Sequence, residues 1–201
     1  AKTLFPYTTL FRSQLQPGVW AKDITLHMLG KFGAEGLNYK AIEYVGQGVS
    51  AMNIDDRMTL CNHAAELGAK AALLEADEKT IAWLNEHGAQ TPKPVFSDPD
   101  AIYAQTLEID ASLLAPQVAR KHQVDDIVAA HEGNKQAIQF ALIGTCTNGR
   151  LDDIRQAAAI LKGKKLASGV RMIVTPASRQ IYLSALREGL IEILTMAGAS
   201  F

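Results

Sequence analysis

The segment IGTCTNGR, residues 143–150, places a cysteine where the ligand-binding loops of α/β proteins occur. The apolar run AIQFALIG before it predicts a buried strand, and LDDIRQAAAILKGKK after it predicts a helix with acidic residues first and lysines last. Strand ends in open α/β sheets bind ligands, and the helix N-terminus would favour the thiolate of Cys146. Thr145, Thr147 and Asn148 could donate hydrogen bonds to that sulfur or to an anion. A plainer interpretation stays open, in which Cys146 is a small buried hydrophobe beside a turn.

The segment RMTLCNHAAELGAK supplies a second candidate, because Asn62 and Glu66 are four residues apart and would share one face of a helix. The small apolar residues around Glu66 could partly bury its carboxylate and suit it to proton transfer. The plainer alternative is a solvent-exposed glutamate. Cys61 points in another helical direction and is interpreted as packing. No two histidines form a spaced metal pair, so each is interpreted as structural or exposed: His27, His63, His87, His122 and His131.

Apolar periodicity predicts the elements that must position these residues. Helices are expected over 20–36, over 50–74 with a cap near Asn53 or Asp55, over 77–88, over 151–165, and over 178–199 with a break near Gly189. Strands are expected over 39–46, 107–109, 137–144 and 170–176. The order strand, loop, helix, strand around Cys146 is a βαβ unit, so the fold class is α/β.

The first residues have a different explanation. Thr3–Ser13, TLFPYTTLFRS, matches in order the eleven-residue translation of a common short-read sequencing adapter. We interpret residues 1–13 as an adapter-derived artefact outside the native fold. The biological sequence is then expected to start near Gln14, on a protein truncated at its N-terminus.

A turn-rich connector suggests how the rest of the chain divides. The segment AQTPKPVFSDPD, residues 89–100, holds three prolines and predicts a boundary near residue 105. One α/β subdomain would span 14–105 and carry Asn62 and Glu66, and another would span 106–201 and carry Cys146.

Composition excludes several classes of protein. The 201 residues include 20 basic and 21 acidic side chains, a net charge of −1 that gives no support to a nucleic-acid or membrane-surface protein. No apolar run approaches the roughly 20 residues that span a bilayer. The two cysteines lie far apart with no CxxC pair, which disfavours a self-contained zinc site. We expect a globular protein of the cytoplasm.

The two chemistry-bearing segments, MTLCNHAAELGAK and IGTCTNGRLDDIR, resemble the aconitase superfamily of iron–sulfur hydro-lyases. The resemblance is strongest to 3-isopropylmalate dehydratase large subunits and homoaconitase-like proteins, and it covers essentially everything after residue 13. It implies a fragment of the aconitase-type three-layer α/β/α domain, with parts of two subdomains. The cysteine loop is specific to the superfamily but does not decide between its members.

The resemblance also assigns site residues. It implies that Cys146 is one of three cysteine ligands of a [4Fe–4S] cluster, with Asn148 beside it, and that the other two ligands lie beyond Phe201. Soft thiolates suit such clusters, and three ligands on four irons leave one iron open as a Lewis acid. Asn62 and Glu66 would lie near the cluster, with Glu66 contacting an iron-bound water or hydroxide. A fragment with only part of this site is expected to be inactive alone.

The implied reaction is the isomerisation of 2-isopropylmalate and 3-isopropylmalate in leucine biosynthesis, on a small hydroxy-acid substrate and with a small dehydratase subunit as partner. Homoaconitase, aconitase and dimethylmalate dehydratase are alternatives within the superfamily. Two other classes stay open. One is a non-catalytic RNA-binding aconitase relative. The other is a nucleotide-binding α/β enzyme with residues 144–150 as phosphate cradle, although GxGxxG and a Walker lysine are missing from that loop.

Overall fold

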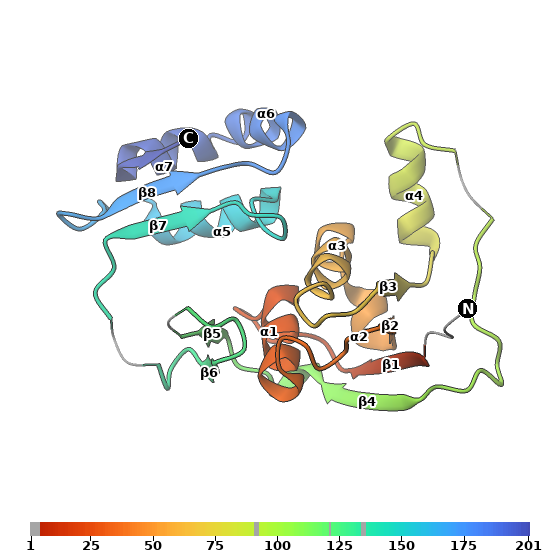
Figure 1. Ribbon diagram of the computed structural model, residues 1–201. Helices are drawn as coiled ribbons and strands as arrows, with labels where there is room; N and C mark the ends of the chain where they lie inside the picture. Colours follow the sequence, from red (N-terminus) through yellow and green to blue (C-terminus); the bar gives the residue numbers. More distant parts are fainter. Residues whose placement is uncertain (1–4, 91–92, 121, 134–135) are drawn as a thin grey trace. The chain divides into compact units, whose positions relative to one another are not determined.

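The protein is described by a computed structural model of residues 5–90, 93–120, 122–133 and 136–201 (Figure 1). Its chain forms two compact units, residues 1–133 and residues 134–201. Each unit contains a parallel sheet with helices packed on it, so the predicted α/β class is confirmed. In the part of the chain that is described, no helix is long and apolar enough to cross a membrane.

The first unit is built on a four-stranded parallel sheet in the order β3-β2-β1-β4. These strands are β1 (Phe5–Arg12), β2 (Lys40–Val45), β3 (Ala71–Leu74) and β4 (Gln105–Asp110). Its helices are α1 (Ala21–Phe32), α2 (Gln47–Ala51), α3 (Ile54–His63) and α4 (Glu78–Glu86). The short 3₁₀ turn η1 (Ala111–Leu113) leads to an antiparallel pair, β5 (Gln117–Ala119) and β6 (Ile127–Ala129).

Helix α1 shows how sequence becomes packing in this unit. Ile24 and Met28 recur at helical spacing, are fully buried, and join Ile42 of β2 in the core. Asp23 starts the helix, because its Oδ2 accepts from the backbone N–H of Trp20 at 2.7 Å. Its Oδ1 accepts from the N–H of Gln117 at 2.6 Å, which ties the start of β5 to the helix.

The expectation that residues 1–13 lie outside the fold is wrong for residues 5–12. They form β1, which pairs in parallel with β2 on one side and β4 on the other. Phe11 is fully buried, and its ring lies at a tilt to that of Tyr44, with centroids 5.9 Å apart. The alternation of apolar and hydroxyl residues in this segment suits a strand with two distinct faces. Residues 1–4 lie outside the described residues, and the adapter origin, a matter of nucleotide sequence, stays a prediction.

Deleting residues 1–13 is expected to destabilise the first unit strongly, because it removes a strand with hydrogen-bonded neighbours on both sides. Denaturant unfolding of residues 14–201 and of the whole chain, followed by circular dichroism, measures the effect. Phe11→Ala is the milder companion variant and is expected to lower the free energy of unfolding by about 3–5 kcal/mol. Equal unfolding midpoints for all three proteins would show that the segment only rests on the sheet.

The boundary expected near residue 105 does not appear in the structure, which divides after Gly133. Strand β4 belongs to the first sheet, where Leu107 pairs with Thr9 of β1. Leu107 and Ile109 are buried in the first unit's core. The proline-containing connector is therefore a crossover within one sheet rather than a link between domains.

The long helix expected over 50–74 is also wrong, although its cap is confirmed. The Asn53 side chain accepts from the backbone N–H of Asp56 at 2.8 Å and starts α3. The helix ends at His63, turns follow over 64–68, and β3 begins at Ala71. Gly68 ends these turns, because its φ is +81° and a Cβ there would lie 2.1 Å from Asn38 Oδ1.

The second unit confirms the predicted βαβ arrangement. Its parallel strands are in the order β7-β8-β9, namely β7 (Phe140–Ile143), β8 (Arg171–Val174) and β9 (Ala199–Ser200). Its helices are α5 (Leu151–Leu161), α6 (Arg179–Arg187) and α7 (Leu190–Ala197). The break predicted near Gly189 is confirmed, because that residue separates α6 from α7 in a left-handed conformation.

Strand β7 is not buried as the continuous apolar run predicts. Its side chains alternate, with Phe140 and Leu142 about half exposed and Ala141 and Ile143 packed against the core. The core that the latter two join is formed with α5, α6 and α7. An apolar run therefore does not show whether helices cover one face of a strand or both.

Candidate functional site

The loop that carries Cys146 is fastened to the segment after β8 by its main chain. The N–H of Thr175 donates to the carbonyl of Ile143 at 2.7 Å, and the N–H of Ala177 donates to the carbonyl of Gly149 at 2.8 Å. Gly144 has φ +115°, and a Cβ there would lie 2.1 Å from the Thr175 carbonyl oxygen. The same test at Gly149, with φ +81°, gives 2.4 Å. Both positions therefore require glycine.

Polar side chains inside the loop bond to one another. Thr145 Oγ1 lies 3.3 Å from Thr147 Oγ1, and Thr147 Oγ1 donates to Asn148 Oδ1 at 3.1 Å. Asn148 Nδ2 then donates to Asp153 Oδ1 at 3.2 Å in the first turn of α5. These groups hold the loop in shape, and a contact from Asn148 to a bound group stays a prediction.

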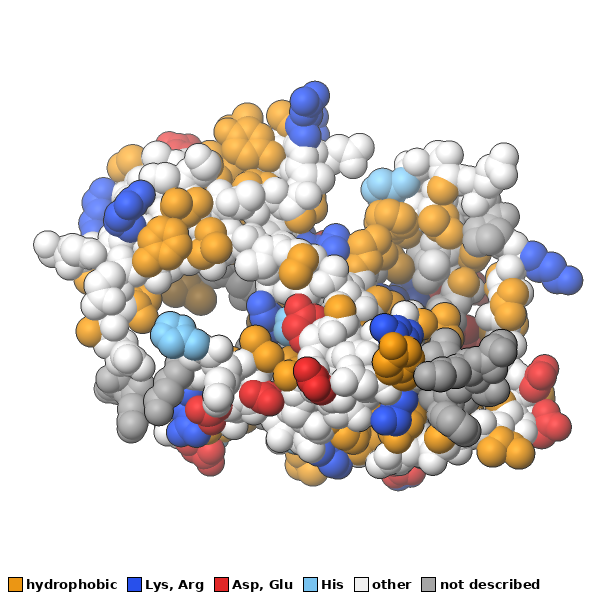
Figure 2. Space-filling view, viewed as in Figure 1, with side chains coloured by type: hydrophobic (Ala, Val, Ile, Leu, Met, Phe, Trp, Pro, Cys, Tyr) orange, Lys and Arg blue, Asp and Glu red, His pale blue; other side chains and the backbone are white. Residues whose placement is uncertain are grey.

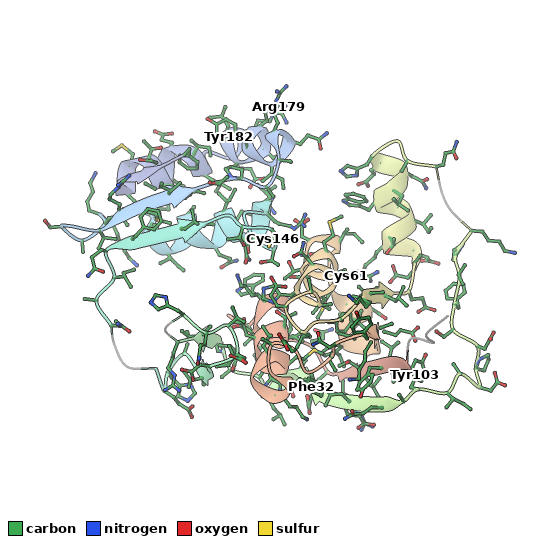
Figure 3. All side chains as sticks on the ribbon, viewed as in Figure 1. Phe32, Cys61, Tyr103, Cys146, Arg179 and Tyr182 are labelled. Carbon is green, nitrogen blue, oxygen red and sulfur yellow. The ribbon has the colours of Figure 1, made fainter. Side chains whose placement is uncertain are left out.

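Cys146 is exposed in the loop between β7 and α5, where Figure 3 labels it. An exposed thiol at the carboxyl end of a parallel strand fits one ligand of an iron–sulfur cluster. The second cysteine does not fit, because Cys61 is half-buried on α3 and its Sγ lies 3.8 Å from the Ala72 carbonyl. Burial raises the pKa of Cys61 to about 11, which agrees with the packing interpretation.

The residues described here do not bring together three His, Cys, Asp or Glu side chains able to hold a metal ion. The donor set therefore fits a single ligand of a cluster and not a complete metal site.

Asn62 and Glu66 do not share a helical face as predicted. Asn62 lies in the last turn of α3 and is exposed, whereas Glu66 is half-buried in the turn after the helix. There the N–H of Ala65 donates to the Asn62 carbonyl, and the N–H of Glu66 donates to the His63 carbonyl, each at 3.2 Å. Such i→i+3 turns place side chains three residues apart over one another. This geometry makes His63 the neighbour of Glu66.

Two buried polar atoms mark this turn. Glu66 Oε2 and His63 Nδ1 are buried and have no hydrogen-bond partner in the described part of the chain. His63 is only 7% exposed. Its burial agrees with the interpretation of the histidines as structural or exposed. If the sequence analysis had placed the helix end at His63, the spacing of three residues would have predicted that His63 and Glu66 are neighbours.

A cavity of about 360 Å³ lies at the carboxyl ends of β2 and β3, and none of the predicted site residues lines it. Its lining includes Arg57, which pairs with both carboxylate oxygens of Asp77 at 2.6 Å. It also includes Glu43, which accepts a hydrogen bond from Tyr103. These groups tie neighbouring elements of the first unit together.

Charge on the visible surface is mixed. Figure 2 shows Lys and Arg side chains scattered among acidic ones on this face, without a continuous basic stripe.

Comparison with known proteins places the chain in a family. Residues 8–201 match the model of the aconitase family (aconitate hydratase). A 3-isopropylmalate dehydratase large subunit from Elusimicrobium minutum is 48% identical over 91% of this chain and 44% of its own. A protein described as a probable methanogen homoaconitase large subunit, from Methanosarcina mazei, is 46% identical over 92% of this chain and 47% of its own.

The fold agrees with that placement. The crystal structure of holo aconitase X from Thermococcus kodakaraensis covers 98% of this chain and 42% of its own with a TM-score of 0.53, at 14% identity. The chain spans about half the length of the curated relatives it matches. The chain belongs to the aconitase family.

Proposed function

We propose that this chain is part of an iron–sulfur hydro-lyase that interconverts 2-isopropylmalate and 3-isopropylmalate in leucine biosynthesis. The observation that carries the proposal is an exposed thiol, Cys146, on a loop held by its main chain in a member of the aconitase family. The name of the E. minutum relative supports the choice of substrate. The small hydroxy acid, the small subunit and the cytoplasmic location belong to the same proposal.

The chain's own residues take defined roles in it. Cys146 would hold one iron of a [4Fe–4S] cluster, and Asn148 would fix the loop beside it. When bound, the cluster supplies a Lewis acid that activates a hydroxyl and a carboxylate of the substrate. Glu66 would move the proton that accompanies departure and return of water, and Asn62 would help to orient the substrate.

Homoaconitase is the second candidate, favoured by the M. mazei relative at 46% identity. Both activities remove water from a small hydroxy acid, so they require the same roles of Cys146 and Glu66. They differ in the substrate's side group. Direct comparison of substrates therefore separates them.

A chimera tests the proposed function. This chain replaces the matching segment of the E. minutum large subunit, and the product is purified without oxygen together with that organism's small subunit. After reconstitution with iron and sulfide, we expect visible iron–sulfur absorbance and dehydration of isopropylmalate. Homocitrate, dimethylmalate and citrate are assayed beside it, with the unaltered E. minutum enzyme as control. A folded chimera that carries the cluster but dehydrates none of the four acids contradicts the proposal.

A further inference from the structure

The turn after α3 brings two chemically complementary groups together. His63 is the last residue of α3, and the N–H of Glu66 donates to its carbonyl at 3.2 Å. In this turn the two side chains leave the backbone in similar directions. His63 Nδ1 and Glu66 Oε2 are both buried, and neither has a hydrogen-bond partner among residues 5–90, 93–120, 122–133 and 136–201.

Burial favours the neutral form of the His63 imidazole. Burial lowers the pKa of His63, the charge of Glu66 opposes that shift, and Lys22 of α1 adds to it. A neutral imidazole carries one N–H, and a carboxylate oxygen is its natural acceptor. If the proton is on Nδ1, one hydrogen bond satisfies both buried atoms.

We propose that His63 is a positioning residue for Glu66, with the neutral imidazole donating its Nδ1–H to Glu66 Oε2. The inference rests on the proposed function, in which Glu66 transfers a proton. The bond fixes one carboxylate oxygen and leaves Oε1 for proton transfer. It is not formed in this structure, and hydrogen bonds of catalytic groups commonly tighten only when the site is assembled.

Three variants of the chimera test this role. His63→Leu removes the donor, His63→Asn places an amide near the position of Nδ1, and His63→Gln places it near that of Nε2. We expect His63→Leu and His63→Gln to lower kcat by about 10- to 100-fold, the cost of losing a group that orients a site residue. KM should change little, and His63→Asn should restore most of kcat. If His63→Leu does not fold, the kcat values of His63→Asn and His63→Gln test the role of His63. Equal kcat values for these two variants overturn the proposal.

A readout independent of activity uses the assembled chimera, reconstituted and bound to its small subunit. Nitrogen-15 NMR of the histidine rings identifies the tautomer of His63, and we expect the proton on Nδ1. Glu66→Gln should shift the Nδ1 resonance, whereas Glu35→Gln, an exposed control, should not. A proton on Nε2, or a resonance insensitive to Glu66→Gln, overturns the proposal.

The outcomes also distinguish the proposed role of Glu66 from the positioning role of His63. A fully active Glu66→Gln chimera removes the proposed role of Glu66 and the positioning role with it. An inactive Glu66→Gln chimera beside a His63→Leu chimera with normal kcat overturns the positioning role alone.

Discussion

Cys146→Ser in the chimera is expected to abolish the bound cluster and to lower turnover by more than about 100-fold. Removing a group that hydrogen-bonds to a metal ligand already lowers metal affinity or activity by about 10- to 100-fold. In this variant the ligand itself is lost. A serine hydroxyl is a hard donor that does not replace a thiolate on an iron–sulfur cluster. Visible absorbance, iron content per protein and the rate of isopropylmalate dehydration measure the result.

Cys61→Ser is the matched control for that experiment. Cys61 is half-buried beside the Ala72 carbonyl, so its replacement should leave cluster absorbance and turnover unchanged. The 201-residue chain alone should not hold a stable cluster, because its second thiol is committed to packing. An active, cluster-bearing Cys146→Ser chimera would refute the assignment of the loop.

The cysteine loop could be predicted from sequence because its determinants are local. An apolar strand, a short polar loop with Gly144 and Gly149, and a helix with early acidic residues are adjacent in the chain. Their order alone places Cys146 at a strand end. The hydrogen bonds that hold the loop could not be predicted, because Thr175 and Ala177 approach it from the segment after β8, which is distant in the sequence.

Glu66→Gln is expected to leave the cluster in place and to lower kcat by about 10²- to 10⁴-fold, the usual contribution of a general acid–base group. Glutamine keeps the size and the hydrogen-bonding capacity of the side chain but cannot exchange a proton. Cluster absorbance and steady-state kinetics on isopropylmalate measure the effect in the chimera.

Glu35→Gln serves as the control, because Glu35 is an exposed glutamate in the same unit. It should not change kcat. Wild-type turnover by the Glu66→Gln chimera would return Glu66 to the plainer interpretation, a glutamate without a chemical role.

The surroundings of Glu66 could be predicted only in part. The cap at Asn53 is a local signal and was predictable. The turn at Gly68 was not, because the close approach of Asn38, which leaves no room for a Cβ there, is a tertiary feature that periodicity does not show. The division of the chain into two units could not be predicted from local signals either. The connector after α4 resembles a domain linker by composition, but pairing of β4 with β1 decides where the unit ends.

The main-chain anchoring of the Cys146 loop bears on how such an enzyme acquires its cofactor in the cell. Gly144 and Gly149 let the loop close on the Thr175 carbonyl, and main-chain hydrogen bonds within the second unit fix the position of the thiol. In the proposed enzyme, cofactor assembly would then start by capture on a ligand that the fold already holds in place. Until that capture the exposed sulfur is open to oxidants. The yield of active enzyme would therefore depend on how quickly the cluster is delivered, more than on how quickly the chain folds.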